Sequence, residues 1–456
     1  MKAKKNVRLW VGLAAAAVIL VPLLVVLTLR LEGTKPEVRL DPSSPAIGVA
    51  HELSGSVTDG NSGIRKLWIA LYKDGKESVL FEKVYGGSVL WGKSETSRAS
   101  FKVTISPEKL GLTDGEALLR IVARDYSWRN WLNGNRTYIE KSVTIDTRPP
   151  RIDILTGAHN ISQGGSGLVL YRLSENCPHN GVRVGDNFFP GHTTPDYPSD
   201  VRLAFFALAH DQPAGSAIFV QASDSAGNVS KRGFRHYVKK KRFRHDIINI
   251  SDGFLNSKIP EFTMMIPGSS GLSTVDTFLK VNRDVRRQNS AEIIRVTGKT
   301  ENRKLWEGRF LRLPKSATRA RFAERRTYRY KGRDIDKQVH MGIDLASTRQ
   351  SPVPAANSGK VAFVGSLGIY GNTVILDHGL GLFSLYAHLS SITSKEGQAV
   401  KQGEIIGRTG SSGMAGGDHL HYSMLVHNTF VDPVEWWDET WIKNNISGKL
   451  ELELSK

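Results

Sequence analysis

The stretch from Leu9 to Leu29 constrains this chain more than any other feature, because it runs for 21 residues without a charged side chain. A helix of about 20 apolar residues is long enough to cross the hydrocarbon core of a bilayer. The basic residues ahead of the stretch are Lys2, Lys4, Lys5 and Arg8. Positive charge on that side favours a cytoplasmic N-terminus. The sequence therefore predicts a transmembrane helix within residues 1–31, with the rest of the chain outside the cytoplasm.

A cleaved signal peptide is the alternative interpretation of the same stretch. The apolar run is long for the core of a signal peptide, and the residues at its end, LTLRLEGT, contain no small-x-small cleavage site. No second apolar run of this length follows in the sequence. We therefore expect an uncleaved anchor that crosses the membrane once.

Length and composition limit the classes of protein that this chain can belong to. A chain of 456 residues is too long for one ordinary core and predicts about three domains. Its 62 basic and 44 acidic residues give a net charge of +18, which favours anionic surroundings such as an acidic polymer or lipid. No zinc-finger, RRM-like or basic-helix signature is present, so we do not expect nucleic acid as a partner. Cys177 is the only cysteine, so a metal would have to be held by histidines and carboxylates.

Residues 36–147 show short alternating strands separated by turn residues, which predicts a β-sandwich. Within KLWIALYKDGKESVLFEKVY, residues 73–76 (KDGK) predict the turn of a β-hairpin. The segments LRIVARDYSWRN (119–130) and IFVQASDSAGNVS (218–230) share an apolar strand, the pattern A-x-D and a turn with Ser and Asn. This echo predicts a second, irregular sandwich over residues 148–245. Both segments resemble bacterial immunoglobulin-like domains, and DGNSGI at 59–64 matches their common first turn.

Residues 246–320 are interpreted as a partly helical connector that packs against the segment following it. The stretch STVDTFLKVNRDVRRQNSAEIIRV (273–296) has helical periodicity, with Ser273 or Thr274 as the N-cap. The charge run KKKRFRH at 239–245 is interpreted as a solvated edge that discourages pairing between strands of different molecules.

Histidines gather near the C-terminal end of the chain. Seven lie in the first 339 residues, and six lie in the last 117, at positions 340, 378, 388, 419, 421 and 427. Most fall in three patterns, HMGIDLAS, LYAHLS and DHLHYS, within glycine-punctuated sequence that predicts a compact sheet with little helix. Alternate side chains of a strand share a face, so His419 and His421 are expected to point into one site, with Leu420 and Tyr422 pointing away.

These residue types suit hydrolytic zinc chemistry. A catalytic zinc needs three protein ligands and an open position for water. His340 and Asp344 are four residues apart and share a face in either a strand or a helix, and one histidine of the H-x-H pair supplies the third ligand. The remaining imidazoles are then free to orient the water, move protons and stabilise an oxyanion.

The motifs HMGIDLA, YAHL, GQAVKQGEIIG and HLHY, in this order and at these separations, resemble the lysostaphin and LytM-type zinc metallopeptidases, which cut peptide bonds in bacterial peptidoglycan. The resemblance implies that His340, Asp344 and His421 bind Zn²⁺ and that His388 and His419 serve catalysis. It also implies a small antiparallel β-roll of the duplicated hybrid motif type over residues 321–437, with the site in a groove across the sheet. Residues 438–456 are then a C-terminal tail.

Two positions depart from the usual motif of that family. Ser384 stands where a threonine is common, and Asp418 stands where a proline or a small residue often precedes H-L-H. Neither change removes a ligand, although Asp418 could perturb the neighbouring imidazole. His378 is interpreted as structural and His427 as a surface residue.

We therefore predict a mainly β protein with an N-terminal transmembrane helix, two immunoglobulin-like sandwiches, a connector and a LytM-like domain. The predicted function is a zinc metalloendopeptidase that hydrolyses cross-links or stem peptides of peptidoglycan. It would be anchored in the cytoplasmic (inner) membrane, with its catalytic domain in the periplasm or cell envelope. The alternative is a non-catalytic regulator that binds and activates cell-wall amidases. Such relatives lack members of the five-residue set, whereas this chain contains all five.

Overall fold

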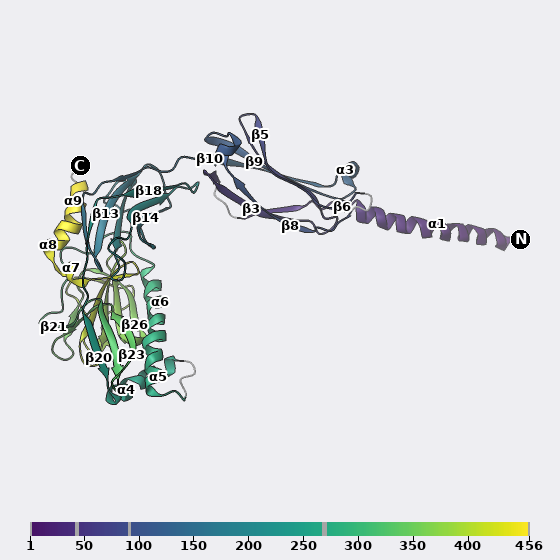
Figure 1. The fold of residues 1–456 in the computed structure, drawn as a ribbon. Coiled ribbons are helices and arrows are strands. Elements are labelled where there is room, and N and C mark those ends of the chain that lie inside the picture. Colours follow the sequence, from purple (N-terminus) through teal and green to yellow (C-terminus); the bar gives the residue numbers. More distant parts are fainter. Residues whose placement is uncertain (1, 42–44, 90–92, 267–270, 455–456) are drawn as a thin grey trace. The chain divides into compact units, whose positions relative to one another are not determined.

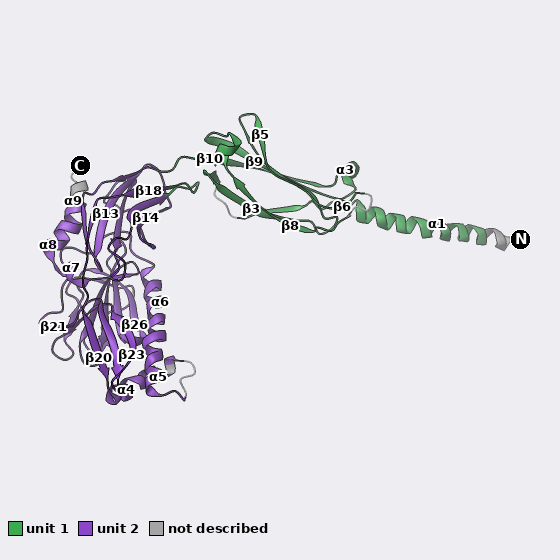
Figure 2. Ribbon diagram, viewed as in Figure 1, with its two compact units in different colours: residues 1–150, 223–229 green, residues 151–222, 230–456 purple. Residues whose placement is uncertain are grey.

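The computed structural model describes residues 2–41, 45–89, 93–266 and 271–454, and strands make up most of its regular structure (Figure 1). The predicted mainly β class is thus confirmed. The chain divides into two compact units, shown in Figure 2. The first comprises Met1–Pro150 and Ser223–Val229, and the second comprises Arg151–Ala222 and Ser230–Lys456.

The N-terminal helix α1 runs from Lys2 to Arg30 and contains Pro22. Its segment Val7–Arg30 has a mean hydropathy of 2.7 and is long and apolar enough to cross a membrane. Large apolar side chains such as Trp10 and Leu29 are exposed on it. A helix that is apolar on all sides requires an apolar environment, which a bilayer supplies. The predicted helix is therefore present, and its topology in a membrane stays a prediction.

The rest of the first unit is a β-sandwich. One sheet has the order β1-β3-β8, and the other has the order β2-β10-β9-β4-β5. Apolar residues of both sheets, such as Val57 of β3 and Ile121 of β9, are fully buried in one core. The bounds are β1 (Glu37–Leu40), β2 (Ala46–Ile47), β3 (His51–Thr58), β4 (Ile64–Lys73), β5 (Lys76–Val84), β8 (Arg98–Ile105), β9 (Gly115–Asp125) and β10 (Arg136–Ile145); minor elements are β6 (Gly87–Ser88), β7 (Lys93–Ser94), α2 (Pro107–Leu110) and α3 (Arg129–Leu132).

The predicted hairpin turn in this sandwich is confirmed. Asp74 and Gly75 join β4 to β5 with φ angles of 50° and 80°. Positive φ at both central residues is typical of the type I′ turn, whose twist matches that of the flanking strands. The immunoglobulin-like identity of the sandwich stays a prediction.

The second unit begins with three small sheets, ordered β11-β13-β16, β12-β19 and β15-β14-β17-β18. Their strands are β11 (Ile152–Ile154), β12 (His159–Ser162), β13 (Ser166–Leu173), β14 (His179–Val184), β15 (Asn187–Pro190), β16 (Val201–Ala207), β17 (Ile218–Ser223), β18 (Val229–Gly233) and β19 (His236–Lys239). Strands β13 and β16 are buried along almost their whole length, which indicates that both of their faces are covered.

The connector is helical where the sequence predicts it. Its elements are β20 (His245–Ile250), α4 (Asp252–Lys258), the 3₁₀-helix η1 (Ile259–Met265), α5 (Thr274–Lys280), the π-helical turn η2 (Val281–Val285) and α6 (Arg286–Thr297). Ser273 caps α5, since its Oγ accepts a hydrogen bond of 3.1 Å from the backbone N–H of Asp276. The helical periodicity of residues 273–296 is confirmed, and the π-helical turn η2 lies between α5 and α6.

An antiparallel sheet ordered β21-β24-β32-β28-β27-β26-β30, with β33 paired to β32, forms the C-terminal half of the second unit. Beside it lie the sheets β20-β22-β23 and β25-β31-β29. Strand bounds are β21 (Ala317–Ala320), β22 (Glu324–Tyr330), β23 (Arg333–His340), β24 (Ile343–Ala346), β25 (Pro352–Pro354), β26 (Gly359–Ser366), β27 (Asn372–Asp377), β28 (Leu382–Leu389), β29 (Ser391–Ile392), β30 (Ala399–Val400), β31 (Ile405–Arg408), β32 (Leu420–Val426) and β33 (Thr429–Val431).

Short helices complete the second unit. They are η3 (Gly368–Tyr370), α7 (Pro433–Trp437), α8 (Glu439–Ile442), the π-helical η4 (Lys443–Ser447) and α9 (Gly448–Leu454). The segment interpreted as a tail is thus helical as far as Leu454. Ile442 and Ile446 are buried in the core of the second unit.

The two faces of the large sheet are covered by different parts of the chain. On one face, Tyr386 and Tyr422 belong to a core that also contains Trp436 of α7 and Phe205 of β16. This core joins the C-terminal sheet to the strands that precede the connector. The other face, which carries Leu385, packs against the connector helices (Figure 1). The candidate site lies on this second face.

The junction inside the second unit contains a buried carboxyl group, Glu435 of α7. Its Oε2 accepts a hydrogen bond of 3.0 Å from the backbone N–H of Ser166, the first residue of β13. Burial raises the pKa of Glu435 from 4.5 to about 7. The carboxyl group of Glu435 therefore ionises at lower pH in the unfolded state than in the folded state. Below about pH 4.5 it is neutral in both states and does not affect the free energy of unfolding. As the pH rises from there towards 7, it increasingly destabilises the fold.

We expect Glu435→Gln to be more stable than the parent at pH 8 by about 2–3 kcal/mol, and by less than about 1 kcal/mol at pH 5, because one pKa unit corresponds to about 1.4 kcal/mol. The glutamine oxygen can still accept the hydrogen bond from Ser166. Urea unfolding followed by tryptophan fluorescence at both pH values measures the difference. Glu439→Gln, at the exposed start of α8, is the matched control. An advantage that does not grow with pH would contradict this description of Glu435.

Candidate metal and catalytic site

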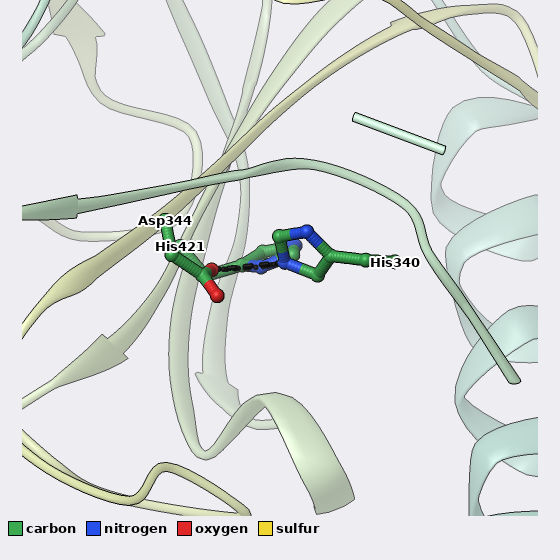
Figure 3. Close-up of side chains that lie close together, drawn as sticks. All are labelled: His340, Asp344 and His421. Atoms are coloured by element: carbon green, nitrogen blue, oxygen red, sulfur yellow. Dashed lines mark hydrogen bonds and ion pairs between the residues drawn. The ribbon is translucent and has the colours of Figure 1, made fainter. Parts of the chain in front are cut away.

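Three neighbouring strands bring His340, Asp344 and His421 together, and Figure 3 shows their side chains pointing towards one another. His340 ends β23, Asp344 lies in β24 and His421 lies in β32. The register of β24 and β32 places Asp344 directly opposite His421. Leu420 and Tyr422 are buried in the core on the opposite face of β32, as the alternation of the sequence predicts.

The three side chains meet through His340 Nε2, Asp344 Oδ1 and His421 Nδ1, and each pair of these atoms is 2.9 Å apart. Burial raises the pKa of Asp344, but the imidazoles of His340, His419 and His421 outweigh it and hold that pKa well below its usual range. The carboxylate is therefore ionised at neutral pH and acts only as an acceptor.

Hydrogen bonds around the site decide which ring nitrogens carry protons. His340 Nδ1 donates to the carbonyl oxygen of Arg321 at 3.0 Å, so a neutral His340 presents the Nε2 lone pair. Ser423 Oγ donates to Met341 O and therefore accepts from His421 Nε2 at 3.0 Å, which leaves the Nδ1 lone pair of His421 free. Burial lowers the pKa of His421 to about 4, which keeps this ring neutral.

When His340 and His421 are both neutral, three lone-pair atoms thus converge within 2.9 Å of one another with no hydrogen between them. Such an arrangement is repulsive unless a cation lies among the three atoms. Two imidazole nitrogens and one carboxylate oxygen are the donor set that Zn²⁺ takes in hydrolytic sites, with a further position left for water. The hydrogen bonds to Arg321 and Ser423 orient the rings as partners of metal-bound histidines do. The residues present therefore fit a zinc ion.

Gly342 in HMGID is required by the packing behind His421. A Cβ at this position would lie 2.6 Å from His421 Nε2 and 2.5 Å from Ser423 Oγ. Both distances are too short for non-bonded atoms, so any side chain would disrupt the hydrogen bond that orients His421.

His388 reaches the site through an irregularity in β28. Asn372 pairs with Leu389 and Val374 pairs with Tyr386, so Ala387 and His388 both lie opposite Thr373. His388 has a φ of 62°, in the left-handed region that residues other than glycine rarely adopt. A bulge of this kind re-aims a side chain. In a regular strand His388 would share the face of Tyr386, away from the site.

The two histidines predicted to be catalytic lie beside the three predicted ligands. The ring centroid of His388 is 4.9 Å from that of His419 and 5.8 Å from that of His421. His388 Nδ1 donates to Ser412 O at 2.9 Å, and His419 Nδ1 donates to Gly417 O at 2.8 Å. In each neutral ring, Nε2 is therefore the nitrogen left for proton transfer.

The two rings differ in their preference for a proton. Burial lowers the pKa of His388 well below its ordinary value. Burial also lowers the pKa of His419, but the Asp344 carboxylate, 3.6 Å from His419 Nε2, outweighs this and raises the pKa overall. Two neighbouring groups with opposite shifts are suited to separate acid and base roles.

Arg326 of β22 is a member of the site that the sequence analysis missed. Its Nη2 lies 3.2 Å from Asp344 Oδ2 and its Nε lies 3.4 Å from Glu324 Oε1. The pairing holds the second oxygen of Asp344, so that Oδ1 faces the two histidines. The segment ERRTYRY contains three arginines, and only the contact with Asp344 in the folded chain distinguishes this one.

The site opens into a cleft of about 460 Å³. All five predicted residues line it, together with Arg326 and Tyr370. The opposite wall comes from the connector, including Ile250 of β20, Phe254 of α4 and Phe278 of α5. The cleft therefore combines an apolar wall with a floor of imidazoles and charges, as ligand sites commonly do.

Three further residues singled out in the sequence lie outside the site. His378 is fully buried and bonds Ser358 O and Ser384 Oγ, both at 2.7 Å. Asp418 accepts hydrogen bonds from Thr409 Oγ1 and Gln350 N, so its carboxylate holds neighbouring loops. The interpretation of His427 as a surface residue is wrong, because its ring stacks on His192 and its Nε2 is buried.

Comparison with known sequences agrees with this geometry. The chain is 43% identical over 97 residues to DD-carboxypeptidase/endopeptidase Mpg of Neisseria meningitidis, which covers 21% of this chain and 22% of that protein. It is 36% identical over 96 residues to peptidoglycan DD-endopeptidase ShyB of Vibrio cholerae, with coverage of 21% and 22%. The chain thus spans about a fifth of the length of these curated relatives.

Two solved structures are similar to part of this chain. The catalytic domain of lysostaphin from Staphylococcus simulans is 29% identical, with 29% of this chain and 98% of that chain covered and a TM-score of 0.25. The catalytic domain of the prophage-encoded M23 protein EnpA from Enterococcus faecalis is 30% identical, with 28% and 95% covered and a TM-score of 0.24. Residues 338–433 match Peptidase family M23. The C-terminal part of this chain is therefore a domain of Peptidase family M23.

Proposed function

We propose that this protein is a membrane-anchored zinc endopeptidase that hydrolyses peptide bonds in bacterial peptidoglycan. The observation that carries the proposal is the convergence of three lone-pair atoms, from His340, Asp344 and His421, at 2.9 Å beside two further imidazoles. The names of the relatives Mpg and ShyB, a carboxypeptidase/endopeptidase and a peptidoglycan endopeptidase, support the substrate class.

The metal would be held by His340 Nε2, Asp344 Oδ1 and His421 Nδ1. A zinc ion supplies Lewis acidity, which makes water nucleophilic near neutral pH and polarises a peptide carbonyl. Arg326 keeps Asp344 oriented towards the two imidazoles through its contact with Oδ2. These groups are fixed by hydrogen bonds before substrate arrives, so little reorganisation is needed during the reaction.

His388 and His419 are proposed as the proton-transfer groups. His388 is held neutral by burial and keeps the Nε2 lone pair, so it is suited to accept a proton from the attacking water. His419 has a raised pKa and Nε2 near Asp344, so it is suited to donate a hydrogen bond to the developing oxyanion. The apolar wall formed by the connector would exclude water from the scissile bond.

A non-catalytic regulator is the alternative from a different class. A chain that only binds a partner has no need for three metal ligands with hydrogen-bonded orienting groups, or for a bulge that places His388 beside His419. The intact set therefore favours the enzyme. The helix α1 and the +18 net charge support anchoring at a membrane and attraction to an anionic wall polymer.

The zinc content of the parent and its variants distinguishes the residues that bind the metal from the residues that only lie near it. We expect the full chain, purified in detergent, to carry about one zinc per molecule, because three protein ligands and one open position satisfy this ion. His340→Ala and Asp344→Ala should both lose the metal and all hydrolysis. His340→Ala is the cleaner variant, since Asp344→Ala also leaves Arg326 with less charge compensation. Elemental analysis by mass spectrometry measures the zinc, and His236→Ala on the exposed strand β19 is the control. Retention of zinc by His340→Ala would refute the assignment.

A variant that loses turnover but keeps its zinc identifies a proton-transfer group. We expect His388→Ala to retain zinc and to lose activity by about 10²–10⁴-fold, the usual contribution of a general base. Muropeptides released from purified peptidoglycan, separated by chromatography and identified by mass, measure the rate and show which bond is cut. A zinc-loaded His388→Ala with parental turnover would remove His388 from the mechanism, and a zinc-loaded parent that releases no peptide would refute the proposed function.

A further inference from the structure

A second cluster of ionisable groups lies in the first unit and plays no part in the peptidase site. One carboxylate oxygen each from Glu32, Asp59 and Asp125 lies within 4.8 Å of the others. Glu32 follows α1, Asp59 lies in the loop between β3 and β4, and Asp125 is the last residue of β9. The cluster therefore joins the segment after the apolar helix to the β3–β4 loop and to the end of β9.

Asp59 has a buried oxygen without a partner. Its side chain is only 3% exposed. Oδ1 accepts hydrogen bonds from the backbone N–H groups of Asn61 and Gly63, at 3.2 and 2.6 Å. Oδ2 is buried and has no hydrogen-bond partner among the described residues. A buried carboxylate oxygen with no donor is costly, so this atom is available to a ligand that is absent from the protein alone.

Asn135 is surrounded by more acceptors than its amide group can satisfy. Its Nδ2 lies 2.8 Å from Asp125 Oδ2, 3.1 Å from Glu32 O, 3.3 Å from Glu32 Oε1 and 3.1 Å from Thr34 O. An amide nitrogen has two hydrogens, so four oxygens compete for them. Carboxylate oxygens of Glu32 and Asp125 and the backbone carbonyls of Glu32 and Thr34 thus lie around one amide nitrogen, and Asp59 lies close to the two carboxylates.

Burial and the neighbouring carboxylates both act on Asp59 and Asp125. Burial raises the pKa of Asp59, and the charge of Glu32 adds to this; burial likewise raises the pKa of Asp125, with Asp59 adding to it. Nearby Arg129 directs its Nε to the carbonyl oxygen of Leu31 at 2.8 Å.

We propose that Glu32, Asp59 and Asp125 bind a calcium ion together with the oxygens of the segment 32–34. The candidate ligand atoms of the three carboxylates and of the segment 32–34 are all oxygens, and Ca²⁺ takes six to eight oxygen ligands with flexible geometry. Mg²⁺ requires a stricter octahedron and keeps several waters, so it fits this collection of protein oxygens less well.

The position of the cluster gives the ion a mechanical role. Hydrogen bonds already join the segment after α1 to the sandwich, including the one from Ser127 Oγ to Glu32 O at 2.9 Å. An ion that also binds Glu32 and Asp59 would lock this segment to the β3–β4 loop. The sandwich would then extend stiffly from the end of the apolar helix when calcium is present, and would pivot there when calcium is absent. This role does not depend on the peptidase activity.

The test uses the full chain in detergent, freed of calcium on a chelating resin and reloaded with zinc so that the peptidase site is filled. Calcium is titrated by calorimetry, and hydrogen exchange is measured over residues 31–36 and 59–63. We expect the parent to bind one equivalent more than Asp59→Asn, with a dissociation constant of about 10⁻⁶–10⁻³ M. Calcium should also slow exchange at least several-fold in both segments of the parent and in neither segment of the variant.

Asp59→Asn separates ion binding from a purely structural role, because asparagine keeps Oδ1 for Asn61 and Gly63 and removes only the charge. Without calcium, this variant should unfold at the same temperature as the parent or higher, since a repulsive buried charge is gone. Asp125→Asn is a second variant with the same expected loss of one equivalent. Asp74→Asn, in the exposed β4–β5 turn, is the matched control and should bind like the parent.

Equal calcium stoichiometry in the parent, Asp59→Asn and Asp125→Asn would overturn the proposal. The proposal would also be overturned if 10 mM calcium left hydrogen exchange over residues 31–36 of the parent unchanged. This concentration is roughly ten times the largest dissociation constant expected of extracellular calcium sites. A separate titration with magnesium distinguishes the two cations. If magnesium alone gave the extra equivalent, the assignment to calcium would be wrong.

Discussion

The contact on which the site depends is the meeting of three lone pairs at 2.9 Å. Left to themselves these atoms would repel one another, so the fold must hold them in place by other means. The β24–β32 register sets Asp344 opposite His421, and Arg321 and Ser423 orient the two rings. Holding these atoms together without an ion destabilises the fold, and the packing of the surrounding core offsets this cost. The position between the three atoms is therefore suited to a cation.

The large sheet can hold these repelling atoms in place because both of its faces are covered. Trp436 and its neighbours join one face to the strands before the connector, and the connector helices cover the other face, where the cleft lies. The domain of Peptidase family M23 is therefore not separated from the preceding strands by a free linker. Its sheet shares a core with β13 and β16, and a buried carboxyl group, Glu435, lies at that junction.

The two metal sites proposed for this chain follow different chemistry. The peptidase site presents imidazole nitrogens and one carboxylate oxygen, a mixed set that suits zinc and leaves room for water. The cluster around Asp59 presents only oxygens and three negative charges, a set that suits calcium. One cation would serve hydrolysis, and the other would stiffen the connection between the apolar helix and the first sandwich.

The sequence by itself determined the apolar helix, the mainly β class and the Asp74–Gly75 hairpin, because these depend on local periodicity and turn residues. The approach of residues 340, 344 and 421 was implied by the resemblance of the motifs to a known family. The tertiary structure alone decided the rest. His388 reaches the cleft through a bulge opposite Thr373, Arg326 is selected by its packing beside Asp344, and Asp59 meets Glu32 across a loop. Each of these contacts joins residues that are distant in the chain or breaks the regular alternation of a strand, and neither property is encoded in a local pattern.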